Sequence, residues 1–155
     1  MAKLRSAEGC PWDRKQTHHS LKPYLIEEAY ETLQALDDED SNRLCDELGD
    51  LLLQIGLHAQ IASESGDFDI TDVLQRINHK LIRRHPHVFG GSEVESAEEV
   101  AHNWEEIKQE EKGRNKPLLG GIPKDIPALA YTQIVQQRVA RVGFDWKEMK
   151  GVLAK

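Results

Sequence analysis

Two pairs of acidic residues constrain the fold of this chain more than any other feature. Glu28 and Glu31 form the first pair and Glu47 and Asp50 the second, and the members of each pair are three residues apart. On an α-helix this spacing places both carboxylates on the same side. The segment DDEDSN, residues 37–42, separates the pairs and is rich in residues that form turns and helix caps. The sequence therefore predicts a helical hairpin in which two facing helices bring four carboxylates together.

Carboxylates at such close range need a partner of positive charge. Like charges at short distance disfavour each other's ionisation, and Mg²⁺ relieves this repulsion because it prefers oxygen ligands. One acidic pair alone is typical of a solvated helix face, but two pairs on consecutive helices favour metal binding. An all-carboxylate set suits Mg²⁺ or Mn²⁺. A di-iron centre is disfavoured because it uses two Glu-x-x-His motifs, and the chain has one, Glu99 with His102.

Composition excludes several classes of protein. The formal net charge is −7 and the sequence pI is about 5.5, which argues against a broad nucleic-acid or membrane-surface partner because both need a basic face. The longest apolar run, residues 51–53, is far too short to cross a bilayer, and no signal peptide is expected at the N-terminus. Cys10 and Cys45 give no disulfide framework, so the simplest expectation is a reducing, cytoplasmic setting.

Apolar residues recur at helical spacing in five segments, and no segment has the pattern of a strand. The predicted helices span about residues 20–37, 42–64, 71–84, 96–112 and 128–142. The expected fold is an all-α bundle of about four to five helices in one domain, residues 1–155, built on the acidic hairpin. Outside the helices we expect an irregular segment at 1–19, a Gly- and Pro-rich loop at 113–127 and a tail at 143–155.

Helical periodicity also predicts which residues of the hairpin face inward. Ser20 is the expected N-cap of the first helix, and His58 on the second helix is expected to be a hydrogen-bonded core residue rather than a ligand. The expected inward stripes are Leu21, Leu25, Ala29, Thr32 and Leu36 on the first helix, and Leu44, Leu48, Leu51, Leu52, Ile55, Ala59 and Ala62 on the second.

A cluster of basic residues stands out in this acidic chain. Lys80, Arg83 and Arg84 have the spacing that places them on one helix face. One interpretation is a solvated face that pairs with nearby acids, and the other is a phosphate clamp, because guanidinium groups fork onto phosphate oxygens. The GxxxxGK[ST] loop of P-loop enzymes is absent. Since neither Cys nor Ser lies in a nucleophile motif, water is the expected attacking group on a phosphate ester or anhydride.

Several blocks of the sequence resemble one family. Glu27-Glu28-x-x-Glu31, followed by Glu47-x-x-Asp50, resembles the EExxE…ExxD signature of the all-α nucleoside triphosphate pyrophosphohydrolases. The blocks GCPWDRKQTHHSLKPYLIEEAYE, DELGDLLLQIGLHAQ, KLIRRHPHVFG and ARVGFDW look like the MazG branch of that superfamily. The ExxE spacing alone is unspecific, whereas these blocks in this order are highly specific and cover about residues 4–146.

The resemblance implies Mg²⁺-dependent hydrolysis of nucleoside triphosphates to monophosphate and pyrophosphate. Nucleotide-pool housecleaning and general hydrolysis of nucleoside triphosphates are both open as its purpose. By the same resemblance, Glu27 contacts the metal through water or orients the attacking water, which the metal activates for attack at the α-phosphorus. Two sets of residues are carried over from the family's motifs. The implied metal ligands are Glu28, Glu31, Glu47 and Asp50. The implied substrate-binding residues are Lys80, Arg83 and Arg84 on the triphosphate, Trp104 and Lys108 from the fourth helix, and Tyr24 and Ile26 beside the nucleoside.

The family also implies an assembly and an alternative. Such small helical domains form homodimers or higher homo-oligomers, with sites completed near the subunit interface. Many members carry two copies of the domain, whereas this chain holds one and begins close to GCPWD, so a single-domain member and a part of a longer chain are both open. Because both copies need not be active, the alternative function is a catalytically weak Mg²⁺–nucleotide-binding module.

Overall fold

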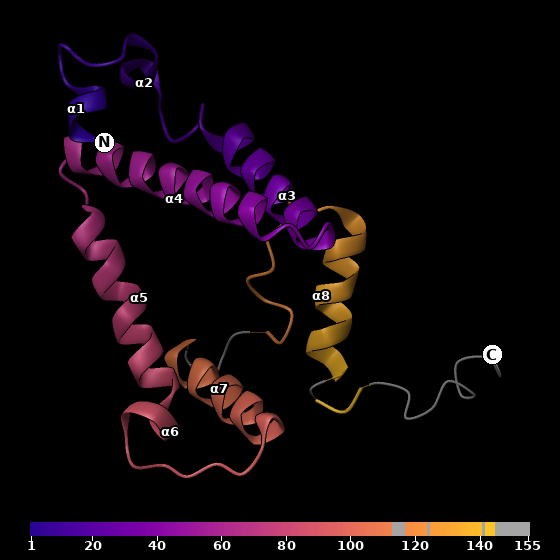
Figure 1. Ribbon diagram of the computed structural model, residues 1–155. Coiled ribbons are helices and arrows are strands. Elements are labelled where there is room, and N and C mark those ends of the chain that lie inside the picture. The colour runs from indigo at the N-terminus through magenta and orange to yellow at the C-terminus, as the bar shows by residue number, and fades with distance from the viewer. Residues whose placement is uncertain (113–116, 124, 141, 145–155) are drawn as a thin grey trace. The chain divides into compact units, whose positions relative to one another are not determined.

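The computed structural model describes residues 1–112, 117–123, 125–140 and 142–144, and every regular element in them is a helix (Figure 1). The predicted all-α class is confirmed. The chain forms two compact units, Met1–Phe89 and Gly90–Lys155. The domain boundaries expected from the sequence remain predictions. The helices of the first unit are α1 (Ala2–Arg5), α2 (Pro11–Lys15), α3 (Lys22–Asp37), α4 (Ser41–Glu64), α5 (Ile70–Arg84) and α6 (Pro86–Phe89). Those of the second are α7 (Ala97–Lys112) and α8 (Ala128–Ala140).

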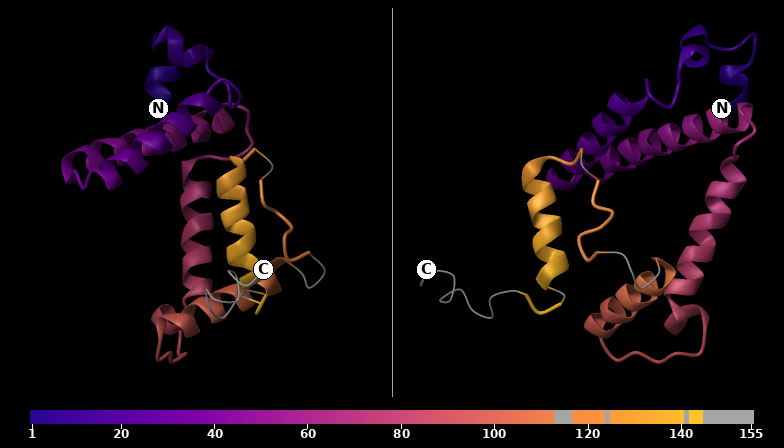
Figure 2. Two further views of the ribbon diagram at one scale, coloured as in Figure 1. Left: turned by 90° about the vertical axis from the view of Figure 1, so that its right-hand side faces the viewer. Right: turned by 180° about the vertical axis from the view of Figure 1, so that it is seen from behind.

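Helices α3 and α4 form the predicted hairpin. They lie side by side in all three ribbon views (Figures 1 and 2) and make the most extensive contact between elements in the described residues. A three-residue turn joins them, and in it Glu39 adopts a left-handed backbone with φ 54°. The carboxylate of Asp40 accepts hydrogen bonds from the backbone N–H groups of Asn42 and Arg43, both at 3.0 Å. It thus satisfies donors that the first turn of α4 would otherwise leave without a partner.

The core of the first unit lies where α3 begins and α4 ends. Leu21, Leu57 and Ile61 form a buried cluster. Thr32 and Ala35 are also buried on α3, and Ala59 and Ala62 on α4. Small side chains at these positions let two helices approach closely.

Part of the predicted inward stripe of each helix is wrong. On α3, Leu21 and Thr32 are buried as expected, whereas Leu25, Ala29 and Leu36 are exposed. On α4, Ala59 and Ala62 are buried as expected, Leu44 and Leu51 are half-buried, and Leu48, Leu52 and Ile55 are exposed. The reason is that both helices are apolar on more than one side, so periodicity alone does not say which apolar side packs within the chain.

The N-terminal segment contains two short helices instead of the expected irregular chain. Arg5 holds it in place, because its guanidinium donates to the backbone carbonyls of Asp13 and Gln16 and forms an ion pair with Glu64 at 2.7 Å. The N-cap of α3 is Leu21 and not the expected Ser20. The Ser20 hydroxyl instead accepts from the backbone N–H of Thr17 at 2.9 Å and closes the turn before the helix.

Helix α5 begins and ends where its sequence dictates. Asp69 is its N-cap and forms a reciprocal capping box with Asp72. The helix stops before Pro86, as expected, because a proline disfavours helical backbone in the residue that precedes it. Leu74, Ile77 and Leu81 on this helix are exposed.

At the start of α7, in the second unit, the hydrogen bonds form only part of a capping box. The Ser96 hydroxyl accepts from the backbone N–H of Glu99 at 3.1 Å, but the Glu99 carboxylate reaches back to Glu95 rather than to Ser96. Helix α8 ends at Ala140 and not at residue 142. Within this unit the Arg138 guanidinium donates to the carbonyl of Gly120 at 2.8 Å and ties residues 117–123 to α8.

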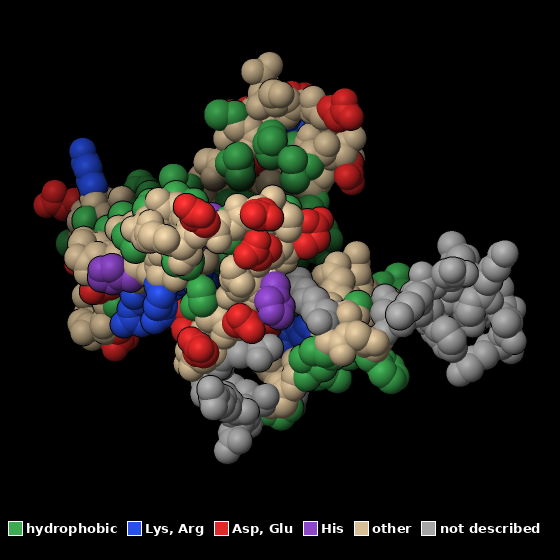
Figure 3. All heavy atoms as spheres, turned by 90° about the horizontal axis from the view of Figure 1, so that it is seen from below, with side chains coloured by type: hydrophobic (Ala, Val, Ile, Leu, Met, Phe, Trp, Pro, Cys, Tyr) green, Lys and Arg blue, Asp and Glu red, His purple; other side chains and the backbone are tan. Residues whose placement is uncertain are grey.

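The surface agrees with the acidic composition. On the face in Figure 3, acidic side chains recur across the described residues, and basic side chains occur in a few small groups. Among the described helices, none is long and apolar enough to cross a membrane.

Candidate metal centre in the α3–α4 hairpin

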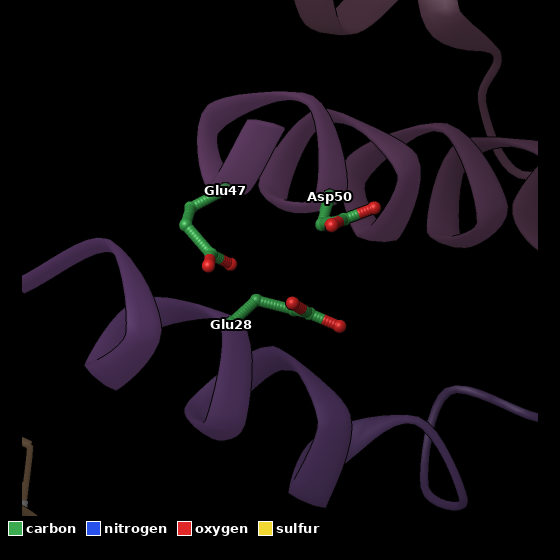
Figure 4. Close-up of side chains that lie close together, drawn as sticks. All are labelled: Glu28, Glu47 and Asp50. Atoms are coloured by element: carbon green, nitrogen blue, oxygen red, sulfur yellow. The ribbon is translucent and has the colours of Figure 1, made fainter. Parts of the chain in front are cut away.

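Three of the four predicted metal ligands meet across the hairpin. Glu28 comes from α3, and Glu47 and Asp50 come from α4 one turn apart. One ligand oxygen from each residue lies within 4.8 Å of the other two. In Figure 4, Glu28 and Glu47 extend into the space between the two helices, and Asp50 lies on the same side of α4. The juxtaposition predicted for four carboxylates is therefore present for three of them.

The electrostatics of this group are consistent with a cation site. The pKa of Glu28 is raised, first by burial of its carboxyl group and then by the charges of Asp50, Glu31, Glu27 and Glu47. Burial and neighbouring negative charge both disfavour the ionised form. A divalent cation reverses this balance, because it supplies positive charge to oxygen ligands. The donor set of three carboxylates thus fits a hard cation such as Mg²⁺.

Glu31 and Glu27 lie beside this group but outside it. Both are on α3 and both are exposed. Neither belongs to the set of oxygens within 4.8 Å of one another, although the charge of each contributes to the raised pKa of Glu28. The role of Glu31 as a fourth ligand and that of Glu27 in orienting water stay predictions.

One residue of this region was missed by sequence reasoning. The Nε group of Arg43 lies 3.3 Å from Oε1 of Glu47, and its Nη1 lies 3.1 Å from Oδ2 of Asp38. Arg43 precedes Glu47 by four residues, which is the spacing of neighbours on one helix face. That spacing was available in the sequence and could have identified the pair.

The predicted phosphate-binding residues lie elsewhere in the same unit. Lys80, Arg83 and Arg84 occupy the last turns of α5. Figure 1 shows α5 leaving the C-terminal end of α4, whereas Glu47 and Asp50 lie near the N-terminal end of that helix. In one copy of the chain the basic and acidic sets are therefore not brought together.

The other predicted substrate contacts are divided between the two units. On α3, Tyr24 makes an edge-to-face contact with Trp12, with ring centroids 5.5 Å apart, and Ile26 is exposed. In the second unit Trp104 is half-buried, and Lys108 forms an ion pair with Glu105 at 3.1 Å. The binding roles of these residues stay predictions.

A histidine pair lies farther along α4. The Nδ1 atoms of His18 and His58 are 2.8 Å apart, so one ring donates to the other. Nε2 of His58 is buried and has no hydrogen-bond partner among the described residues. The pKa of His58 is lowered, first by burial and then by the charge of His18. Burial therefore favours the neutral form of His58, and the contact with His18 links the N-terminal segment to α4.

Comparisons with known proteins show which family this chain resembles. The family model of the MazG nucleotide pyrophosphohydrolase domain matches residues 16–89, which include the acidic group and the basic residues of α5. The crystal structure of a MazG-related protein from Thermotoga maritima is similar, with a TM-score of 0.57 and 30% sequence identity. The match covers 69% of this chain and 90% of that one. The chain belongs to the MazG family.

Curated relatives extend the match over the whole MazG chain. A protein of Thermotoga maritima named nucleoside triphosphate pyrophosphohydrolase/pyrophosphatase MazG is 53% identical over 156 residues. The nucleoside triphosphate pyrophosphohydrolase of Escherichia coli (strain K12) is 47% identical over 158 residues. Both matches cover 100% of this chain, and the chain spans 60% of the length of each relative.

Proposed function

We propose that this MazG chain hydrolyses nucleoside triphosphates to nucleoside monophosphate and pyrophosphate, with Mg²⁺ or Mn²⁺ held in the α3–α4 hairpin. The observation that carries the proposal is the meeting of Glu28, Glu47 and Asp50 within 4.8 Å. The names of the two curated relatives support the reaction. The all-oxygen donor set supports the choice of metal. We place this activity in the cytoplasm, since both cysteines are free thiols.

The chain's own residues have distinct roles in this proposal. Glu28, Glu47 and Asp50 hold the cation and Glu31 completes the set, while Glu27 orients the attacking water. When bound, the cation supplies charge to the phosphate oxygens and lowers the pKa of water. Water adds to the α-phosphorus and the bond from that phosphorus to the bridging α–β oxygen breaks. The leaving group is pyrophosphate, and the proton from the attacking water passes to solvent.

The triphosphate needs cationic side chains near the acids, and in the described residues of one copy the basic residues of α5 lie on a helix that leaves the opposite end of α4. We assign this role to Lys80, Arg83 and Arg84, because guanidinium groups bind phosphate bidentately. In our proposal the basic residues come from a second copy in a homodimer or higher homo-oligomer. The exposed leucines of the hairpin, such as Leu48 and Leu52, support such an assembly. Tyr24, Ile26, Trp104 and Lys108 are then proposed to contact the nucleotide.

Mixing two inactive variants tests this division of labour. Asp50→Asn removes an acid and Arg83→Ala removes a cation, and each variant is expected to lose most of its activity. If one site uses residues from two copies, unfolding and refolding the two variants together restores part of the parent activity. If the mixture stays as inactive as its components, the basic residues act within their own copy or do not act at all.

The reaction itself is tested with a panel of nucleoside triphosphates in the presence of Mg²⁺. The products are scored as monophosphate with pyrophosphate or as diphosphate with orthophosphate. The proposal expects the first pair from the parent protein and its loss in Glu28→Ala and Asp50→Ala. Thermal stabilisation by Mg²⁺–nucleotide without any product would instead favour a nucleotide-binding module without turnover.

A further inference from the structure

The proposed function assigns no role to Asp38 and Arg43, which form a charged chain with Glu47. Asp38 lies at the C-terminal cap of α3 and Arg43 in the first turn of α4. The Arg43 guanidinium contacts Asp38 through Nη1 and Glu47 through Nε, at 3.1 and 3.3 Å. These contacts connect the hairpin turn directly to one carboxylate of the acidic group.

The burial of the three side chains indicates what the contact does. Arg43 is 39% exposed and Asp38 is 47% exposed, whereas Glu47 is only 14% exposed. Ion pairs at such exposure contribute little to the free energy of unfolding. A planar guanidinium, however, has donors in a fixed geometry, so it fixes the orientation of the carboxylates that it contacts. The contact is therefore better suited to orienting Glu47 than to stabilising the fold.

The geometry also leaves Glu47 able to bind a ligand. Arg43 contacts only Oε1 of Glu47, and an ionised carboxylate has a second oxygen with its own lone pairs. Metal-binding carboxylates are typically hydrogen-bonded by neighbours that fix their orientation. Asp38 holds the other edge of the guanidinium, so Arg43 itself is restrained from both sides.

We propose that Arg43 is a positioning residue for the cation site: it fixes the Glu47 carboxylate in the orientation that binds the metal, with Asp38 as its anchor. This inference rests on the proposed function, because it takes Glu47 to be a metal ligand. Arg43 need not touch the cation or the nucleotide.

Binding of Mn²⁺ to the full chain without nucleotide tests the inference independently of turnover. Free Mn²⁺ is measured by electron paramagnetic resonance while the protein is titrated. Loss of an orienting neighbour typically weakens metal binding by about 10- to 100-fold, so Arg43→Ala is expected to raise the Kd for Mn²⁺ by at least about tenfold. Arg43→Lys keeps the charge but loses the planar fork and is expected to show a smaller increase. Asp38→Asn is expected to raise the Kd by less than either Arg43 variant does.

A matched control lies at the other end of the same helix. Arg5 pairs with Glu64 on α4 at 2.7 Å, far along the helix from the acidic group. Arg5→Ala is expected to lower the Tm and leave the Kd for Mn²⁺ unchanged. Arg43→Ala is expected to leave the Tm nearly unchanged and to raise the Kd for Mn²⁺. If Arg43→Ala fails to fold, Arg43→Lys and Asp38→Asn decide the question.

The outcomes separate this inference from the proposed function. If the parent binds Mn²⁺ and loses binding in Asp50→Asn, but the Arg43 and Asp38 variants bind as tightly as the parent, the positioning role is overturned and the cation site stands. Tighter binding in Arg43→Ala would also overturn it, because the arginine would then compete with the cation. If the parent does not bind Mn²⁺, or if Asp50→Asn binds equally well, the cation site itself is wrong.

Discussion

Near its N-terminal end, helix α4 presents Glu47 and Asp50 to Glu28 on α3, and near its C-terminal end it presents Glu64 to Arg5. The pKa of Glu28 is raised by burial and by the surrounding negative charges. The pKa of Glu64 is lowered, chiefly by its hydrogen bond to Arg5. The pKa values of two glutamates in one hairpin are thus shifted in opposite directions. The charge of Glu64 is balanced within the chain by Arg5, whereas at the Glu28 end we propose that a bound cation supplies the positive charge.

Neutralising one acid near the N-terminal end of α4 is expected to have the largest effect. Asp50→Asn is expected to lower kcat/KM for nucleoside triphosphate hydrolysis by about 100- to 1,000-fold, the range found when one preorganised electrostatic group is removed from an active site. Asp46→Asn is the matched control, since Asp46 is an exposed acid on the same helix and lies outside the acidic group. Equal losses in both variants would mean that general negative charge, not this group, matters.

At the opposite end, removal of Arg5 should cost stability rather than activity. The Arg5 side chain is only 7% exposed, and Arg5→Ala removes the ion pair with Glu64 and the hydrogen bonds that Arg5 donates to the carbonyls of Asp13 and Gln16. The free energy of unfolding is expected to fall by about 2 kcal/mol in chemical denaturation. Arg14→Ala removes a single exposed hydrogen bond to the carbonyl of Ala7 and should cost about 0.5 kcal/mol. If Arg5→Ala costs no more than this control, the C-terminal end is not held by its charges.

Glu28→Gln should stabilise the metal-free protein while it abolishes metal binding. Because the pKa of Glu28 is raised above its ordinary value of 4.5, the folded protein holds this proton at higher pH than the unfolded chain does. Stability is therefore lost as pH rises from that value through the folded-state pKa. The glutamine variant lacks this penalty, and its Tm at neutral pH is expected to be higher than that of the parent. Addition of Mg²⁺ should then raise the Tm of the parent but not that of the variant.

The smallest expected effect concerns the histidine pair. Since the pKa of His58 is lowered from its ordinary value of 6.5, the unfolded chain takes up this proton before the folded protein does. The contribution of neutral His58 to the free energy of unfolding is therefore fully present above pH 6.5 and is lost as the pH falls below 6.5. Between pH 7 and pH 5 the parent is expected to lose less than about 1 kcal/mol through this group, because partial exposure screens it. His58→Asn should flatten that part of the stability profile, and His19→Asn, at an exposed neighbour of His18, should leave it unchanged.

The sequence predicted the elements that local chemistry determines. Asp40 caps α4, Pro86 follows the end of α5, and the i,i+3 spacing brings Glu47 and Asp50 to the side of α4 that meets Glu28. These features depend on a few neighbouring residues and on helical geometry alone. The hairpin and three members of the acidic group could therefore be predicted from the order of the residues.

What the sequence could not determine depends on contacts between distant residues. Arg5 with Glu64 and His18 with His58 pair over 59 and 40 residues, and no local pattern marks them. The prediction of which apolar side of each hairpin helix is buried was partly wrong for the same reason. Leu36 fits a helical stripe as well as Ala35 does, yet Ala35 is buried and Leu36 is exposed. A small residue permits closer helix packing, and only the partner helix decides which side is used.

The left-handed residue Glu39 has a consequence for the spacing of the acids. Asp38, Glu39 and Asp40 are all that separates α3 from α4, so the number of residues in this connection sets the phase of the second helix relative to the first. Each residue of an α-helix turns the chain by about 100°. Deleting Glu39 is therefore expected to change the side of α4 that faces α3, and so to move Glu47 and Asp50 away from Glu28, while every acid of the group stays in the sequence. A change of one residue in the length of this loop is then expected to weaken cation binding as much as the loss of one of the proposed ligands does.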